Sequence, residues 1–195
     1  MKNPKAKGSS FEREVAKKIS LVLSDGKHDD WVWRTASSGG RFTQKSKTGT
    51  PNKHYAGDIA PVDSRAEEYL TNIVIECKHY KSVDIIRWML DGGGDNGKWV
   101  DTLKETLNHI DNAHIGFLVI KENRKQPFVI GVQKDTYGVE NDDKIHMNDF
   151  FYIMTFKNFL SYLKDVKNIG SARIEYNSIV CNIKITFDNT ERLNA

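Results

Sequence analysis

The stretch Asn72-Ile73-Val74-Ile75-Glu76-Cys77-Lys78 decides the fold, because an apolar run acquires two charges at its end. Three consecutive β-branched residues are typical of a buried β-strand. Side chains two positions apart in a strand share one face, so Glu76 and Lys78 project together while Cys77 points to the opposite side. Burying a carboxylate and an ammonium group is costly unless they pair or bind something. The stretch therefore predicts a buried strand that ends in a functional site.

Asp58 lies in a similar setting, since Gly57-Asp58-Ile59-Ala60-Pro61 reads as a short strand that ends at the proline. If Asp58 and Glu76 converge, their charges repel, and a divalent cation relieves that repulsion. Hard oxygen ligands suit Mg²⁺ or Mn²⁺. A lysine beside the metal orients or helps to deprotonate a water molecule and offsets phosphate charge. Two plainer interpretations stay open: an ion pair between Glu76 and Lys78, and a turn shaped by Asp58 with Gly57.

The rest of the chain places these strands in an α/β fold. The pattern from Ser9 to Glu12 matches a capping box, which predicts a helix over residues 9–23. The other expected elements are strands over 31–34, 57–61, 72–78, 115–120 and 128–132 and helices over 99–110 and 148–166. The expected connections are a long polar loop over 41–55, a polar turn over 63–71 and a hinge over 92–97. This order of elements indicates a mixed β-sheet flanked by helices.

Length and composition limit the class of protein. The chain has 195 residues, enough for one core with an extension. We assign residues 1–140 to the core and residues 141–195 to a C-terminal α+β extension packed on it, with a hairpin over 173–187. No run approaches the ~20 apolar residues of a membrane span, and the two cysteines, Cys77 and Cys181, form neither a disulfide framework nor a zinc site. We therefore expect a cytoplasmic protein with no membrane partner.

The charge distribution points to a polyanionic partner. Residues 1–60 contain 12 Lys and Arg against 6 Asp and Glu, whereas residues 61–195 contain 17 against 20. A basic N-terminal third favours nucleic acid as the partner, although a solvated surface explains the same pattern. The candidate DNA contacts in the long polar loop are Arg41, Lys45, Lys47 and Lys53.

Together, Asp58 and the Glu76-Cys77-Lys78 motif resemble the PD-(D/E)XK nuclease superfamily, whose core has a restriction-endonuclease-like fold. The segment Lys7-Gly8-Ser9-Ser10-Phe11-Glu12-Arg13-Glu14 is similar to the opening helix of archaeal and phage-type Holliday-junction resolvases. Those enzymes also have a basic residue on the next strand before a Ser/Gly loop, which matches Arg34 and the segment Ser37-Ser38-Gly39-Gly40. The resemblance covers roughly residues 7–132.

The resemblance implies a Mg²⁺-dependent endodeoxyribonuclease, with Mn²⁺ able to substitute. Asp58 and Glu76 would bind the metal together with the main-chain carbonyl of Cys77, and Lys78 would position the attacking water. Glu12 would reach the same site from the first helix, directly or through water. The resemblance further implies a homodimer that is encoded by a phage or a mobile element. The DNA contacts indicated outside the loop are Lys7, Arg13, Arg34, Ser37 and Ser38.

The sequence departs from the family pattern in two places, which leaves alternatives open. Gly57 stands where the superfamily often has proline, and an insertion over 63–71 lengthens the gap between Asp58 and Glu76. A nuclease that acts on DNA ends or foreign DNA, and a DNA-binding module without catalysis, are therefore alternatives to a resolvase. Among single residues, Glu12 has the capping box as an alternative role, and Arg13 and Arg34 have salt bridges.

Overall fold

The computed structural model describes residues 4–35, 56–91, 93–110, 113, 115–133 and 151–165. The helices and strands follow in the order α1 (Pro4–Leu23), β1 (Val32–Arg34), β2 (Ile59–Pro61), α3 (Ser64–Leu70), β3 (Ile73–Tyr80), α4 (Ile85–Asp91), α5 (Gly94–Asn108), β4 (Ile115–Glu122), β5 (Phe128–Gln133), β6 (Phe151–Thr155) and α6 (Phe156–Asp165). The loop expected over 41–55 and the hairpin expected over 173–187 lie outside the described residues.

The main sheet is mixed, as the sequence predicts. Its strand order is β3-β4-β5-β6, with β3 parallel to β4 and the other two pairs antiparallel. The long connection from β3 to β4 contains α4 and α5, because parallel neighbours need a crossover. Strands β1 and β2 form a separate antiparallel pair.

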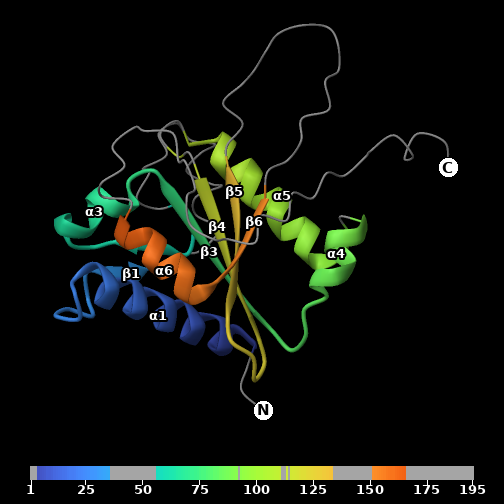
Figure 1. Ribbon diagram of the computed structural model, residues 1–195, viewed down its shortest axis with the longest axis horizontal. Coiled ribbons are helices and arrows are strands. Elements are labelled where there is room, and N and C mark those ends of the chain that lie inside the picture. The colour runs from blue at the N-terminus through green and yellow to red at the C-terminus, as the bar shows by residue number, and fades with distance from the viewer. Residues whose placement is uncertain are drawn as a thin grey trace, which may run out of the picture.

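Helices cover both faces of the main sheet (Figure 1). Helices α1, α3 and α6 pack on one face, where the buried side chains include Ile19, Cys77 and Phe159. Helices α4 and α5 pack on the other face, where Leu103 contacts the side of the sheet that carries Val74. Alternation along β3 sends Val74 to the α5 face and Cys77 to the α1 face. The architecture is an α/β layer structure compatible with a restriction-endonuclease-like core.

Helix α1 begins at Pro4, well before the predicted start at Ser9. Proline suits the first turn of a helix, because the N–H it lacks has no partner there in any case. Ser9 and Glu12 therefore lie inside the helix, and the predicted capping box is wrong. Glu12 is not occupied in closing a helix end, and its carboxylate is available for other contacts.

The connections around β3 contain more helix than expected. Residues 63–71 were expected as a polar turn, which is wrong, because they fold into α3. The carboxylate of Asp63 caps this helix by accepting a hydrogen bond from the N–H of Arg65 at 2.9 Å. Helix α4 was not expected, and α5 begins at Gly94, inside the expected hinge. Both α3 and α4 have seven residues, too few for a clear helical period.

The C-terminal part adds an α+β unit to the same sheet. The single helix expected over 148–166 is wrong in its first part, since β6 pairs there with β5 and places Ile153 opposite Ile130. Helix α6 follows at once and buries Phe159 and Leu163 in the α1 face of the core. The boundary expected at residue 140 falls outside the described residues.

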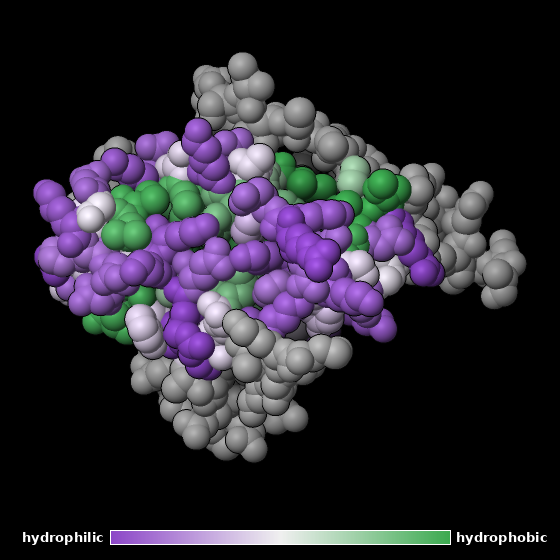
Figure 2. All heavy atoms as spheres, turned by 90° about the horizontal axis from the view of Figure 1, so that it is seen from below, coloured by the Kyte–Doolittle hydropathy of each residue, from purple (hydrophilic) through white to green (hydrophobic). Residues whose placement is uncertain are grey.

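One face of the described part is mainly polar. On the face seen from below, hydrophilic residues predominate and hydrophobic residues form separate patches (Figure 2). None of the described helices combines the length and the apolar character that crossing a bilayer requires.

Candidate active site

Asp58 lies at the edge of β3 that does not pair with β4, named here the outer edge. Its N–H donates to the carbonyl of Ile75 at 2.8 Å, and its Oδ2 accepts from the N–H of Cys77 at 2.8 Å. The residue is only 3% exposed. In a strand the N–H and C=O of one residue point to the same edge, so the Cys77 carbonyl also lies on the Asp58 side. Two oxygen donors therefore meet at the outer edge.

Glu76 and Lys78 project together from the α5 face of β3, which confirms the predicted alternation. The Lys78 Nζ lies 3.1 Å from the Glu76 Oε2, and the Glu76 side chain is 16% exposed. Cys77, between them, is buried among the side chains of the α1 face. The ion pair that the sequence left open is present, but it does not account for Asp58, whose charge acts on both Glu76 and Lys78.

Glu12 reaches the site from α1. Its carboxylate accepts a hydrogen bond from the Arg34 Nε at 3.0 Å, and its side chain is 11% exposed. The charges of Asp58 and Lys78 both act on this carboxyl group, so α1, β3 and the turn before β2 contribute to one electrostatic cluster. Arg34, at the end of β1, serves as the salt-bridge partner that the sequence offered as its alternative role.

The backbone conformation of Gly57 explains why this chain has no proline before Asp58. Its φ is +78°, a left-handed conformation that the proline ring cannot adopt. A Cβ at this position would lie 2.7 Å from the carbonyl oxygen of Ile75 and 3.2 Å from the Cγ1 of Val74. The glycine therefore lets the Gly57–Asp58 turn approach the outer edge of β3 closely enough for the carboxylate of Asp58 to reach the N–H of Cys77.

Two carboxyl groups of this cluster, those of Glu12 and Glu76, have a raised pKa. Burial raises the pKa of Glu76 to about 7, with the Asp58 charge adding to the effect and Lys78 opposing it. Burial also raises the pKa of Glu12; Asp58 adds to this rise, whereas Arg34 and Lys78 oppose it. Burial lowers the pKa of Lys78, but the carboxylates of Glu76 and Asp58 outweigh it and raise the pKa overall. The ammonium group therefore stays charged beside the carboxylates.

The pKa of Glu76 makes stability depend on pH. In the unfolded chain Glu76 releases its proton near pH 4.5, and in the folded protein near pH 7. Between these values the folded state binds more protons, so the free energy of unfolding of the metal-free protein should fall by about 2–3 kcal/mol as pH rises. Urea unfolding at a series of pH values between about 4.5 and about 8 measures this. The Glu76→Gln variant should lack this component, and an equal slope in both proteins would contradict the assignment.

The oxygen donors fit a hard divalent cation. Among the described residues, no group of three His, Cys, Asp or Glu side chains is arranged to hold a metal ion. Mg²⁺ needs no such group, because it usually takes one or two carboxylates and keeps several waters. Asp58 and the Cys77 carbonyl supply hard oxygens at the outer edge, and Glu76 supplies them from the adjoining α5 face of β3. The mutual repulsion of the two carboxylates is what a cation relieves.

Comparison with known proteins identifies the family at this point. Residues 3–175 match the model of the family described as "Phage putative PDDEXK endonuclease". The chain belongs to this family. No curated protein and no solved structure matches the chain. Membership supports a nuclease that acts within DNA and a phage origin, and it confirms the PD-(D/E)XK superfamily that the Asp58 and Glu76-Cys77-Lys78 motifs indicate.

The structure brings together only part of the residues expected at the endonuclease site. The electrostatic cluster described above contains Glu12, Asp58, Glu76 and Lys78. Arg34 is hydrogen-bonded to Glu12. Of the other expected DNA contacts, Arg13 is exposed on α1 and Lys7 is partly buried near its start. The remaining expected contacts lie outside the described residues; they are Ser37, Ser38, Arg41, Lys45, Lys47 and Lys53.

Thr35 is a positioning residue that the sequence analysis missed. Its Oγ1 donates to the carbonyl of Gly57 at 2.9 Å, and its N–H donates to the carbonyl of Asp58 at 2.9 Å. Only 6% of the residue is exposed. Thr35 thus fixes the turn before Asp58 from the end of β1. Its place directly after Arg34, before the Ser/Gly segment, is the one sequence signal that marks it.

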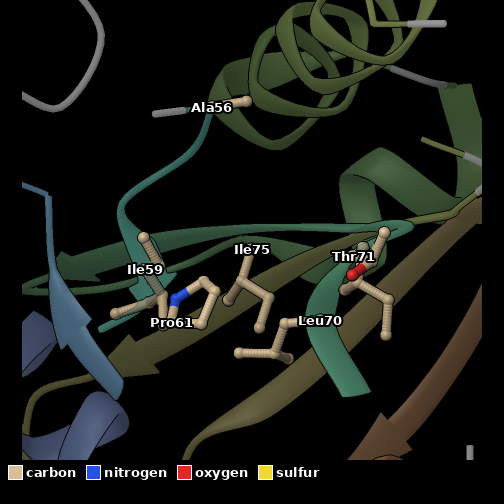
Figure 3. A pocket seen from close by; sticks show the side chains of 8 residues that line it. Ala56, Ile59, Pro61, Leu70, Thr71 and Ile75 are labelled. Atoms are coloured by element: carbon tan, nitrogen blue, oxygen red, sulfur yellow. The ribbon is translucent and has the colours of Figure 1, made fainter. Parts of the chain in front are cut away.

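A small pocket beside Asp58 is not the reaction site. Figure 3 shows Ile59, Pro61, Leu70 and Ile75 around it, contributed by β2, α3 and β3. Its lining contains no charged side chain. The pocket is a gap in the packing beneath β2, whereas the charged cluster lies at the outer edge of β3.

Proposed function

We propose that this PDDEXK endonuclease is a Mg²⁺-dependent enzyme that cleaves branched DNA, most like a Holliday-junction resolvase. The observation that carries the proposal is that Asp58, hydrogen-bonded to β3, acts electrostatically on Glu12, Glu76 and Lys78 together. An ion pair alone needs only two of these groups. Three buried carboxylates with one lysine match what hydrolysis of a phosphodiester needs, namely oxygen ligands and a fixed positive charge.

Each group has a distinct task in this proposal. Bound Mg²⁺ supplies Lewis acidity toward the phosphate and lowers the pKa of a water ligand. Asp58, Glu76 and the Cys77 carbonyl hold the ion, with Mn²⁺ as a substitute. Lys78 stays protonated beside Glu76, so it orients the attacking water and offsets the negative charge that develops on the phosphate. Glu12, fixed by Arg34, joins the same site directly or through water.

DNA reaches the site along the basic N-terminal third in this proposal. Residues 36–55, which contain Arg41, Lys45, Lys47 and Lys53, are flanked in the sequence by Thr35 and Ala56, and Thr35 is hydrogen-bonded to the turn before Asp58. In this proposal the four basic residues contact a bound strand, and exposed Arg13 on α1 adds a phosphate contact. Ser37 and Ser38 would contact the strand from the start of the loop, and Lys7 from the start of α1.

We further propose that the enzyme acts as a homodimer in the cytoplasm of the phage host. A four-way junction has two scissile strands related by approximate twofold symmetry, and a symmetric dimer offers one site to each. This part of the proposal rests on the resemblance to resolvases.

The test is a cleavage assay on a labelled four-way junction and a matched linear duplex, with Mg²⁺ or with EDTA. Paired symmetric nicks in the junction are expected from the wild-type protein, and none with EDTA. Lys78→Ala should lower the rate at least about 10³-fold, because it removes a charge placed at the developing oxyanion. Lys157→Ala is the matched control, an exposed lysine on α6, and should cleave.

Each other outcome selects a different function. Cleavage of both substrates would keep the nuclease and replace the resolvase with a broader DNA-processing enzyme. Binding without any cleavage, with either metal, would favour the DNA-binding module. Wild-type cleavage by Lys78→Ala would remove this residue from the site.

A further inference from the structure

An exposed aromatic pair lies directly beyond the candidate active site. Tyr80 is the last residue of β3 and is 42% exposed. Its ring centroid lies 4.6 Å from that of Trp99 on α5, with the planes tilted by 35°. Trp99 is partly buried and packs against the core of the α5 face. The tyrosine ring therefore packs against Trp99, and part of the ring faces solvent.

The position of Tyr80 relates it to the scissile phosphate. Glu76, Lys78 and Tyr80 share one face of β3, because side chains alternate and the pairing with β4 is unbroken over the whole strand. Two strand residues span about 6.6 Å, and stacked nucleotides follow one another at about 3.4 Å. The ring thus lies roughly one to two nucleotides from a phosphate held at Lys78.

The charges around the ring suit a nucleic acid strand. Lys81 follows the tyrosine and Lys98 precedes the tryptophan; both are exposed, and neither has an ion pair within the described ranges. The acidic residue opposite Tyr80 in the sheet is Glu122, which binds Lys125 at 2.9 Å and the N–H of Val83. Within the described ranges, two exposed lysines without an ion pair thus adjoin the aromatic pair in the sequence, and cations together with aromatic rings are the combination that binds a phosphate backbone and stacks its bases.

We propose that Tyr80, backed by Trp99, is a stacking platform for a nucleobase close to the scissile phosphate. In a continuous duplex, neighbouring bases cover both faces of each base, and exposing a face costs free energy. At a branch point, a flap or a strand end, one face is already free. The platform therefore selects interrupted DNA over continuous duplex. The inference rests on the proposed nuclease function, and it assigns the enzyme's preference for interrupted DNA to one residue.

The experiment compares Tyr80→Ala and Tyr80→Phe with the wild-type full-length chain, binding a four-way junction and a linear duplex without divalent cations. Alanine should weaken junction binding about 5- to 30-fold and leave duplex binding unchanged, because it removes the stacking face. Phenylalanine keeps the face and should bind as wild type. Trp33→Ala is the matched control, since Trp33 is 46% exposed but lies on β1, and it should keep the preference.

A spectroscopic readout separates stacking from a structural effect. Junctions with 2-aminopurine at each position around the branch point should show quenched fluorescence at one or two positions with wild type and Tyr80→Phe, and no such quenching with Tyr80→Ala. An unchanged binding ratio or unchanged quenching in Tyr80→Ala would overturn the inference. Neither measurement requires cleavage, so the absence of cleavage by the wild-type protein would refute the nuclease proposal separately.

Discussion

Asp58→Asn is expected to lower the rate of DNA cleavage at least about 10³-fold with the fold unchanged. The amide oxygen of asparagine still offers an acceptor to the N–H of Cys77, which Asp58 Oδ2 binds at 2.8 Å, so the local geometry survives. What disappears is the negative charge at the outer edge, and with it an anionic oxygen donor for a hard cation. A loss of about 4 kcal/mol of transition-state stabilisation corresponds to this factor.

The stability of the Asp58→Asn variant, unlike its cleavage rate, should not decrease. The Asp58 charge raises the pKa of both Glu12 and Glu76, so its removal relieves repulsion between buried carboxylates. We expect the Tm of Asp58→Asn to equal or exceed that of wild type, and its Kd for DNA to change less than about threefold, because phosphate contacts carry most of the affinity. Single-turnover cleavage, thermal unfolding and equilibrium binding measure the three quantities.

Asp63→Ala is the matched control for this experiment. Asp63 is a neighbouring acidic residue whose carboxylate caps α3 and does not reach the cluster. Its loss should cost about 1 kcal/mol of stability and leave cleavage unchanged. If Asp58→Asn stays folded and cleaves at the wild-type rate, as Asp63→Ala should, the residue does not belong to the site.

Local geometry made part of the site predictable. The pairing of Glu76 with Lys78, and the opposite direction of Cys77, follow from the two-residue period of a strand, which holds wherever the strand lies. The position of Asp58 beside that strand depends on tertiary contacts, which a local pattern does not contain. The sequence signals it only through a resemblance, and the structure supplies its cause, namely the hydrogen bonds of Asp58 to Ile75 and Cys77.

The elements that were mispredicted are those for which local patterns are ambiguous. The apolar run of β6 fits a strand or the start of a helix equally well, and only its pairing with β5 decides. The residues from Ser9 to Glu12 match the sequence pattern of a capping box, yet the helix extends through them to Pro4. In both cases neighbouring structure overrides a signal that a short window cannot resolve.

Gly57→Ala is expected to destabilise the protein by about 2–4 kcal/mol and to lower cleavage at least about 10²-fold. The backbone there has φ +78°, which costs an L-residue about 1–2 kcal/mol. The new methyl group would also lie 2.7 Å from the Ile75 carbonyl oxygen, a backbone atom that cannot rotate away. The turn must therefore withdraw from β3 and take the Asp58 carboxylate with it, and a shift of about 1 Å can cost about 10²-fold in rate.

Gly26→Ala separates conformational strain from the close approach. Gly26 has φ +80° at the end of α1, but no atom lies within 4 Å of its would-be Cβ. Its substitution should cost only the left-handed strain, a fall in Tm of about 2–8 °C, and should leave cleavage at the wild-type rate. Thermal unfolding and single-turnover cleavage of the two variants measure the difference. Equal losses of stability with normal cleavage in both variants would mean that the close approach of the Gly57 turn to β3 does not position Asp58.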